Sequence, residues 1–243
     1  MNSFVFCLLI VVAFGSCLKL PSSFKKCDRK RTDFNQCLSE AIHGALRILE
    51  KPLPSHDLPS LFDVEFPDLV ATFGNRTYGL LQKYDQFRLI GLSQPENIDA
   101  KLDFRPLTST LTIAATYPQL TIEIECEAKG TIVVLPVNVI TPVANIFDHP
   151  TFTFTFELEE YEKGTTYFRV IDSKLDMQVE GIKFGFEHLF SDKVLNEKFN
   201  SAMSAKWRSV FAIFKSFEAI FAPRFGSIFN TLLKKVPVAE LFD

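Results

Sequence analysis

An aromatic stripe near the C-terminus limits what this chain can fold into more than any other feature. Residues 207–229 read WRSVFAIFKSFEAIFAPRFGSIF and contain six phenylalanines and the only tryptophan of the chain. From Leu195 to Leu232, apolar residues recur about every 3.7 residues, close to the period of an α-helix. Such a helix would reach roughly 60 Å, so it requires an equally long apolar partner. Pro223 marks a candidate kink or break.

The partner is predicted from the middle of the chain, where the apolar period changes to two. Residues 120–127 (LTIEIECE) and 151–159 (TFTFTFELE) alternate apolar with polar side chains, as antiparallel strands with one buried face do. A separate helix is expected over about 33–50, with Asp33 and Gln36 as a capping box. The expected fold class is α+β, an elongated and highly curved antiparallel sheet wrapped around one long C-terminal helix.

The N-terminus predicts export. Residues 1–17, MNSFVFCLLIVVAFGSC, combine a short apolar run with small residues suited to a peptidase. The apolar run is too short to span a bilayer, and no later run reaches spanning length. We therefore expect a signal peptide over 1–17 and a single secreted domain over 18–243, without an integral membrane span. Asn75 begins an Asn-Arg-Thr sequon and is a candidate glycosylation site.

Three cysteines remain in the predicted mature chain. Cys27 and Cys37 close a short loop, and the oxidising environment of secretion favours a disulfide between them, with two free thiols as the alternative. The third, Cys126, lies on the apolar face of a predicted strand. It is expected to be a small buried hydrophobe rather than a reactive thiol.

The sequence contains no recognisable catalytic or cofactor motif. There is no G-x-S-x-G, H-E-x-x-H or C-x-x-C, and the four histidines have no metal-ligand spacing. A net charge of −3 argues against nucleic acid as a partner. We therefore expect no enzyme activity, no cofactor and no metal.

The ordered set of CDRKRTDFNQCL, FRLIGLS, YPQLTIEIECEAKGTIVVLPV, LFSDKVLNEKFNSAMSAKWRSVF and KKVPVAELF resembles the takeout and juvenile-hormone-binding proteins of insects. The resemblance covers nearly the whole mature chain. It implies a tubular, takeout-like lipid-binding fold secreted into haemolymph or another extracellular fluid. It also implies carriage of a small apolar ligand, such as a terpenoid or a fatty acid, in hormone, feeding or circadian signalling. The second disulfide of the dedicated hormone carriers has no cysteines here, and Val238 stands where the family's closing motif has an aromatic residue.

The gap between the aromatic helix and the sheet predicts an apolar ligand tunnel. The expected lining comes from both surfaces and includes Ile124, Cys126, Phe152, Phe154, Met203, Trp207, Phe211, Phe214 and Glu218. For Glu218, the one acid within the aromatic arc, three positions stay open: exposure to solvent, pairing with Arg88 or Arg169, or a hydrogen bond to the polar end of a ligand.

An alternative function belongs to another class. It is an extracellular protein that binds a membrane or a partner through the aromatic helix and holds no stable small ligand. The stripe lacks the flanking lysines of an interfacial helix, which favours the carrier. The carrier is expected to be a monomer.

Overall fold

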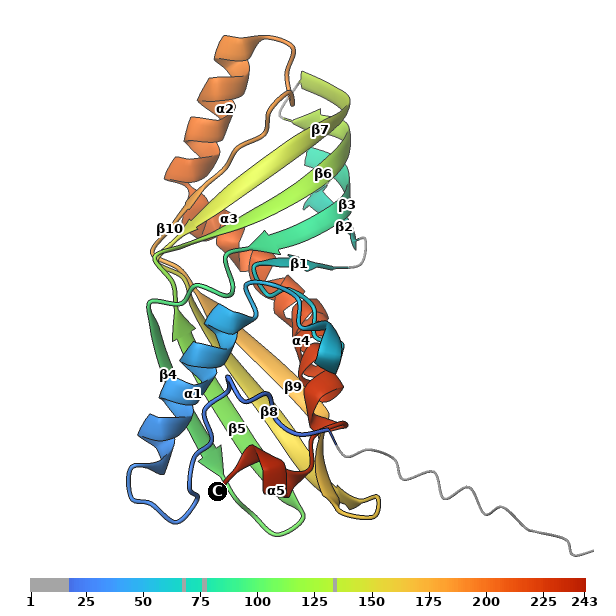
Figure 1. The fold of residues 1–243 in the computed structure, drawn as a ribbon. Helices are drawn as coiled ribbons and strands as arrows, with labels where there is room; N and C mark the ends of the chain where they lie inside the picture. Colours follow the sequence, from blue (N-terminus) through green and yellow to red (C-terminus); the bar gives the residue numbers. More distant parts are fainter. Residues whose placement is uncertain (1–17, 67–68, 76–77, 133–134) are drawn as a thin grey trace, which may run out of the picture.

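The structure, a computed structural model, describes the backbone of residues 18–66, 69–75, 78–132 and 135–243. It describes the side chains of these residues except 69–75, 78–80, 213, 214 and 216. The predicted signal peptide, residues 1–17, lies outside the described residues. The molecule is elongated, with one sheet in each half and helices against both sheets (Figure 1).

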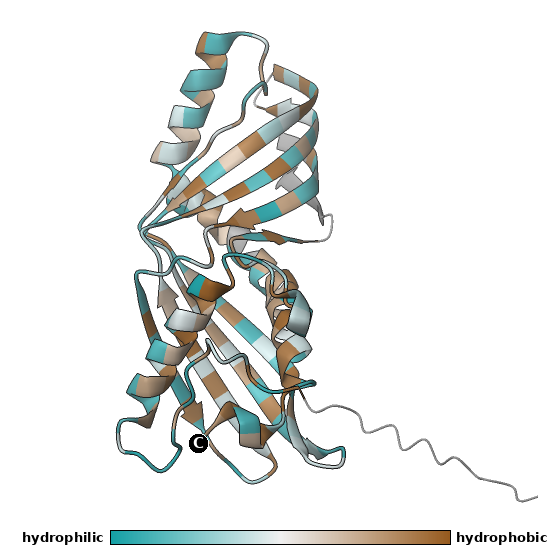
Figure 2. Cartoon of the chain, in the orientation of Figure 1, coloured by the Kyte–Doolittle hydropathy of each residue, from teal (hydrophilic) through white to brown (hydrophobic). Residues whose placement is uncertain are grey.

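In the described part of the chain, ten strands form two antiparallel sheets. The upper sheet of Figure 1 contains β1 (Asp63–Glu65), β2 (Leu69–Asn75), β3 (Tyr78–Ile90), β6 (Gln119–Ile132), β7 (Leu135–Asp148) and β10 (Gly181–Lys183). The lower sheet has the order β4 (Asn97–Asp103), β5 (Thr108–Thr116), β8 (Thr151–Glu162) and β9 (Thr166–Gln178). The predicted alternation is confirmed, because every second residue of β6 from Leu120 to Ala128 is buried, as is every second residue of β8 from Phe152 to Leu158. Figure 2 shows this alternation as bands across the strands.

The chain crosses between the two sheets at a narrow waist. One crossing joins β5 to β6 through Tyr117 and Pro118, and another joins β7 to β8 through His149 and Pro150. The two crossings pair with each other, because the Tyr117 N–H donates to the Pro150 carbonyl at 3.0 Å and the His149 N–H donates to the Pro118 carbonyl at 3.2 Å. This pairing fixes the backbone at the waist.

Helices lie against both sheets. They are α1 (Phe34–Ile48), the 3₁₀ turn η1 (Pro54–His56), α2 (Lys193–Ala205), α3 (Trp207–Phe214), the 3₁₀ turn η2 (Lys215–Phe217), α4 (Glu218–Leu233) and α5 (Val238–Leu241). Within the described residues, none is both long enough and apolar enough to cross a membrane.

The C-terminal helical run is divided into segments instead of being one continuous helix. It breaks at Lys206 and again at η2, and Pro223 lies inside α4. The breaks divide the run between the two sheets, because α2 and α3 contact β10 of the upper sheet and α4 contacts β9 of the lower sheet (Figure 1). The capping role expected of Asp33 is wrong: α1 begins at Phe34, but the Asp33 carboxylate accepts from the Arg31 guanidinium instead.

Both edges of the lower sheet are covered by a helix that satisfies backbone groups of the edge strand. On β4, the Ala100 N–H donates to the Ser39 hydroxyl of α1 at 2.8 Å. On β9, the side-chain amide of Asn230 in α4 both accepts from the Val170 N–H at 2.7 Å and donates to the Val170 carbonyl at 3.1 Å. Exposed strand edges invite pairing with other chains, so these contacts close the sheet and fix the positions of α1 and α4.

The Asn230 contact predicts a stability effect. Replacing Asn230 with Ala removes both hydrogen bonds and leaves an N–H and a C=O of the β9 edge without a protein partner, which should lower the free energy of unfolding by about 1–3 kcal/mol. Urea unfolding measures the change. Thr231→Ala is the matched control, because the Thr231 hydroxyl bonds only within its own helix, to the Ser227 carbonyl. Equal losses of unfolding free energy in the two variants would contradict the role of Asn230 in holding α4 to β9.

Candidate functional site

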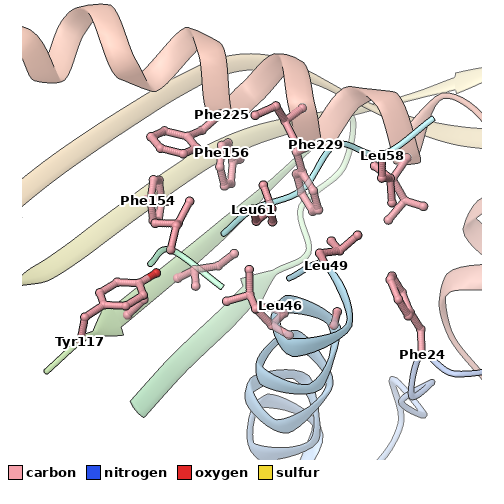
Figure 3. Close-up of a pocket in the computed structure, with 17 residues that line it drawn as sticks. Phe24, Leu46, Leu49, Leu58, Leu61, Tyr117, Phe154, Phe156, Phe225 and Phe229 are labelled. Carbon is pink, nitrogen blue, oxygen red and sulfur yellow. The ribbon is translucent and has the colours of Figure 1, made fainter. Parts of the chain in front are cut away.

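An apolar cavity lies in the lower half, between α1, α4 and the lower sheet (Figure 3). Its volume is about 160 Å³. The residues that line it are Phe24, Ile42, Ala45, Leu46, Leu49, Leu58, Leu61, Leu92, Ile113, Ala115, Tyr117, Phe154, Phe156, Phe225, Ile228, Phe229 and Leu232. All of these described residues are Ala, Leu, Ile, Phe or Tyr, so the cavity attracts apolar molecules and repels charge.

Aromatic rings from β8 and α4 form the wall opposite α1. Phe154 meets Phe225 edge to face at a centroid distance of 4.9 Å, and Phe156 lies against Phe229 at 5.2 Å. The period-two spacing of β8 places Phe154 and Phe156 on the same face, and the helical spacing of α4 does the same for Phe225 and Phe229. The two predicted apolar surfaces therefore do meet, and the cavity is the space that their rings leave unfilled.

The segment before α1 closes one end of the cavity with Phe24, which is half-buried. The Cys27–Cys37 disulfide ties this segment to α1. Further back, the carbonyl of Lys19 lies 2.9 Å from Nε2 of the buried His56. Phe24 is thus a side chain at the mouth of the cavity, held by flanking contacts on both sides.

Tyr117 brings the one polar side chain among the described lining residues. Its backbone is held by the paired crossings at the waist, and its ring packs edge to face on Phe152 at 6.0 Å. Figure 3 shows the hydroxyl oxygen on the cavity side of the ring. Burial raises the pKa of the Tyr117 phenol well above its usual value, so the hydroxyl stays neutral.

The disulfide prediction is confirmed, since Cys27 and Cys37 are bonded at a Cα–Cα distance of 5.9 Å. Cys126 is free and fully buried on β6. Burial raises the pKa of its thiol to about 11, so it holds almost no reactive thiolate at neutral pH. Asn75 ends β2, and its side chain and the following Arg76 and Thr77 lie outside the described residues.

The structure distributes the predicted lining residues over both halves. Phe154 lines the cavity, and Phe152 supports Tyr117 from behind. Ile124 and Cys126 are buried on β6 of the upper sheet. Met203, Trp207 and Phe211 pack partly buried against the core from α2 and α3, and the side chain of Phe214 lies outside the described residues. Ligand contact by these upper residues stays a prediction.

Glu218 occupies a position different from the three considered from the sequence. Its carboxylate accepts a hydrogen bond from the Met177 N–H of β9 at 2.8 Å, and Lys215 Nζ lies 3.8 Å away. It is not among the lining residues of the lower cavity. Glu218 therefore acts at the first turn of α4 as Asn230 does near its end, and both anchor the helix to the edge of β9.

Sequence reasoning missed the wall formed by α1 and the residues around it. The helical spacing of Ile42, Leu46 and Leu49 predicted the helix, but these residues were not part of the expected lining. Phe24, Leu58, Leu61 and Leu92 lie in irregular segments with no periodic signal. The prolines around η1 were the available indication, because they turn the chain back after α1 and bring Leu58 and Leu61 to its apolar face.

This arrangement defines a class of protein, the elongated α+β proteins in which a curved antiparallel sheet and a C-terminal helix bury apolar surface around a ligand cavity. The described residues include no group of three or more His, Cys, Asp or Glu placed to hold a metal. Comparison with known proteins makes the class specific. The chain belongs to the haemolymph juvenile hormone binding protein (JHBP) family, whose sequence profile matches residues 5–243.

A solved structure supports the fold. Takeout 1 of Epiphyas postvittana superposes with a TM-score of 0.74 at 20% identity, over 90% of this chain and 99% of that one, and shows that the fold is takeout-like. A lipopolysaccharide binding protein matches at a TM-score of 0.38 and 9% identity, over 81% of this chain and 37% of that one. A sequence search among curated proteins finds no match. The family consists of proteins that bind apolar ligands and are not known as enzymes.

The position of Phe24 at the mouth of the cavity predicts that a bound ligand is released faster when the Phe24 ring is removed. Phe24→Ala deletes an apolar contact at the end of the cavity, and the dissociation rate of a fluorescent apolar probe in stopped flow should rise about tenfold. Phe104→Ala is the control, because Phe104 lies outside the cavity lining. Its ring centroid is 5.9 Å from that of Phe34 and 6.0 Å from that of Phe242. Identical rates in both variants would contradict a closing role for Phe24.

The cysteine arrangement predicts a thiol count. In the chain lacking residues 1–17, a thiol reagent at neutral pH should label no cysteine in the folded state, because Cys126 is buried and its thiol is protonated. After unfolding without reductant, it should label one. Mass spectrometry of the labelled protein measures both numbers. A labelled Cys27 or Cys37 in the folded protein would contradict the disulfide in solution.

Proposed function

We propose that this protein is a secreted carrier that holds a small apolar ligand, of terpenoid or fatty-acyl type, in the lower cavity. The observation that carries the proposal is an apolar cavity lined by side chains from seven separate segments of the sequence. Protein interiors are normally close-packed and contain few voids larger than a water molecule. A cavity that stays open between two stiff, clamped helices is well suited to a guest molecule.

The size of the cavity limits the guest. An engineered apolar cavity of about 150 Å³ in another protein holds benzene, and this one measures about 160 Å³. A longer ligand therefore needs Phe24 or the apolar face of α1 to shift outward. A ligand that buries roughly 400 Å² of apolar surface gains about 10 kcal/mol before association costs, and these costs leave micromolar or tighter binding.

The membrane-binding alternative receives less support. It requires the aromatic helix to leave the sheet, but α4 is anchored to β9 by Glu218 at one end and by Asn230 at the other. Its rings Phe221 and Phe225 are buried in the core. Releasing α4 would break these hydrogen bonds and expose the rings to water at the same time.

Further proposals accompany this function. Residues 1–17 are removed as a signal peptide, residues 18–243 form one domain, and the carrier acts as an extracellular monomer of the haemolymph type with Asn75 glycosylated. The family assignment, the disulfide and the sequon support these proposals. Roles in hormone, feeding or circadian signalling follow the family resemblance. Native mass spectrometry of the protein from its own source, searching for a co-purified small molecule, would identify the ligand.

The cavity itself can be tested by filling it. Ala45→Leu adds three carbon atoms to a half-buried lining position of α1 and should weaken binding of a fluorescent apolar probe at least tenfold. Ala41→Leu makes the same change one turn earlier on α1, at a residue outside the cavity lining, and should leave the affinity unchanged. Unaltered binding in Ala45→Leu would show that the probe, if it binds, occupies another place.

A further inference from the structure

The Tyr117 hydroxyl is a hydrogen-bonding group in a cavity whose other described walls offer none. The residue is 1% exposed. Among the described residues, no hydrogen bond reaches its hydroxyl, although its backbone N–H is bonded to Pro150. Nearly all buried polar groups in proteins have partners. A buried hydroxyl directed into an apolar cavity therefore indicates a partner that arrives with the ligand.

The structure holds this hydroxyl in a fixed position. The paired crossings at the waist hold the Tyr117 backbone, and Phe152 packs on the ring from the sheet side. A hydroxyl fixed in advance loses little conformational entropy when it bonds a ligand. Its raised pKa keeps the proton on the oxygen, so the group is always able to donate.

Building on the proposed function, we infer that Tyr117 determines which ligands the cavity accepts. They are neutral, mostly apolar molecules with one hydrogen-bond acceptor, such as an ester, ketone, epoxide or ether oxygen, placed against the Tyr117 hydroxyl. A purely hydrocarbon ligand fills the same space but leaves the hydroxyl without a partner. A ligand whose only polar group is a donor gains less affinity, because a phenol accepts a hydrogen bond more weakly than it donates one.

Carboxylates are excluded by the same walls. No Lys, Arg or His is among the described lining residues, and Tyr117 is the one titratable group there. An ionised carboxylate moved into such surroundings loses its hydration without gaining a counter-charge. A fatty acid therefore enters as its protonated form, whose fraction falls tenfold for each pH unit above a pKa of about 4–5. Free acids should bind poorly at neutral pH, and their esters well.

Three ligands with equal numbers of non-hydrogen atoms separate these statements: methyl decanoate, undecanoic acid and tridecane. Each displaces a fluorescent apolar probe from the protein lacking residues 1–17. Tyr117→Phe should weaken methyl decanoate about five- to tenfold and leave tridecane unchanged, because only the ester uses the hydroxyl. Equal effects on methyl decanoate and tridecane, or none on either, would overturn the role of Tyr117.

Tyr161→Phe is the matched control. It removes the same atom from a tyrosine that stacks on Tyr167 at 5.8 Å, outside the cavity lining, and should leave all three affinities unchanged. Thermal unfolding of the empty proteins adds a second readout. Tyr117→Phe should melt no lower than wild type, since its hydroxyl has no partner among the described residues. A clearly lower midpoint would assign Tyr117 to the structure and overturn the inference.

The pH dependence tests the exclusion of acids. Undecanoic acid should bind wild type more than tenfold more weakly than methyl decanoate at pH 7 and should recover about tenfold per pH unit toward pH 5, while the ester stays constant. Acid binding that equals ester binding at pH 7 would overturn the exclusion. The proposed function fails separately, if neither methyl decanoate nor tridecane displaces the probe from wild type.

Discussion

Burial of the C-terminal aromatic stripe is the constraint on which the rest of the structure depends. Phe217, Phe221 and Phe225 are each at most 6% exposed, and together their rings represent several kcal/mol of hydrophobic stabilisation, at roughly 25 cal/mol per Å². No compact sheet is long enough to cover such a run. The chain covers it with two sheets joined at a waist, and the helical run breaks where its cover changes direction (Figure 1).

Covering a helix with an open sheet leaves strand edges exposed. The contacts that satisfy the backbone hydrogen-bonding groups of these edges determine where the cavity forms. Polar side chains of α1 and α4 bond the edge strands β4 and β9, so both helices are fixed at the borders of the lower sheet. Their apolar faces then meet across the sheet at a separation set by backbone contacts. Side chains of ordinary size do not fill that separation, and the cavity remains.

The elements were predictable from the sequence where periodicity carries the information. The two-residue alternation of β6 and β8, the spacing of α1 and the Cys27–Cys37 pair all agree with the structure. The position of the cavity was not predictable, because it depends on which turn of the helix meets which strand. Phe225 and Phe229, which line the lower cavity, lie about five turns beyond Trp207, and ligand contact around Trp207 stays a prediction.

The polar contact that anchors α4 to β9 was equally unpredictable from the hydrophobic pattern of the sequence. Glu218 falls within the aromatic arc of the helix, and helical geometry alone places it among apolar rings. Its partner is a backbone N–H of β9 that is free only because β9 is an edge strand, which depends on the strand order of the sheet. A residue that breaks an amphipathic pattern can thus mark a contact with the backbone of another element as well as a functional group.

The choice between Phe and Tyr shows why Tyr117 stands apart. The chain has 26 phenylalanines and 5 tyrosines, and the other aromatic residues of the cavity are all Phe. At a position that required only a ring to pack on Phe152, Phe would pack equally well without burying a hydroxyl. Packing alone would therefore favour Phe at this position, and the observed Tyr disagrees with that preference. Such disagreements are expected where a residue serves binding, and this one lies at the waist, where the paired crossings hold the backbone.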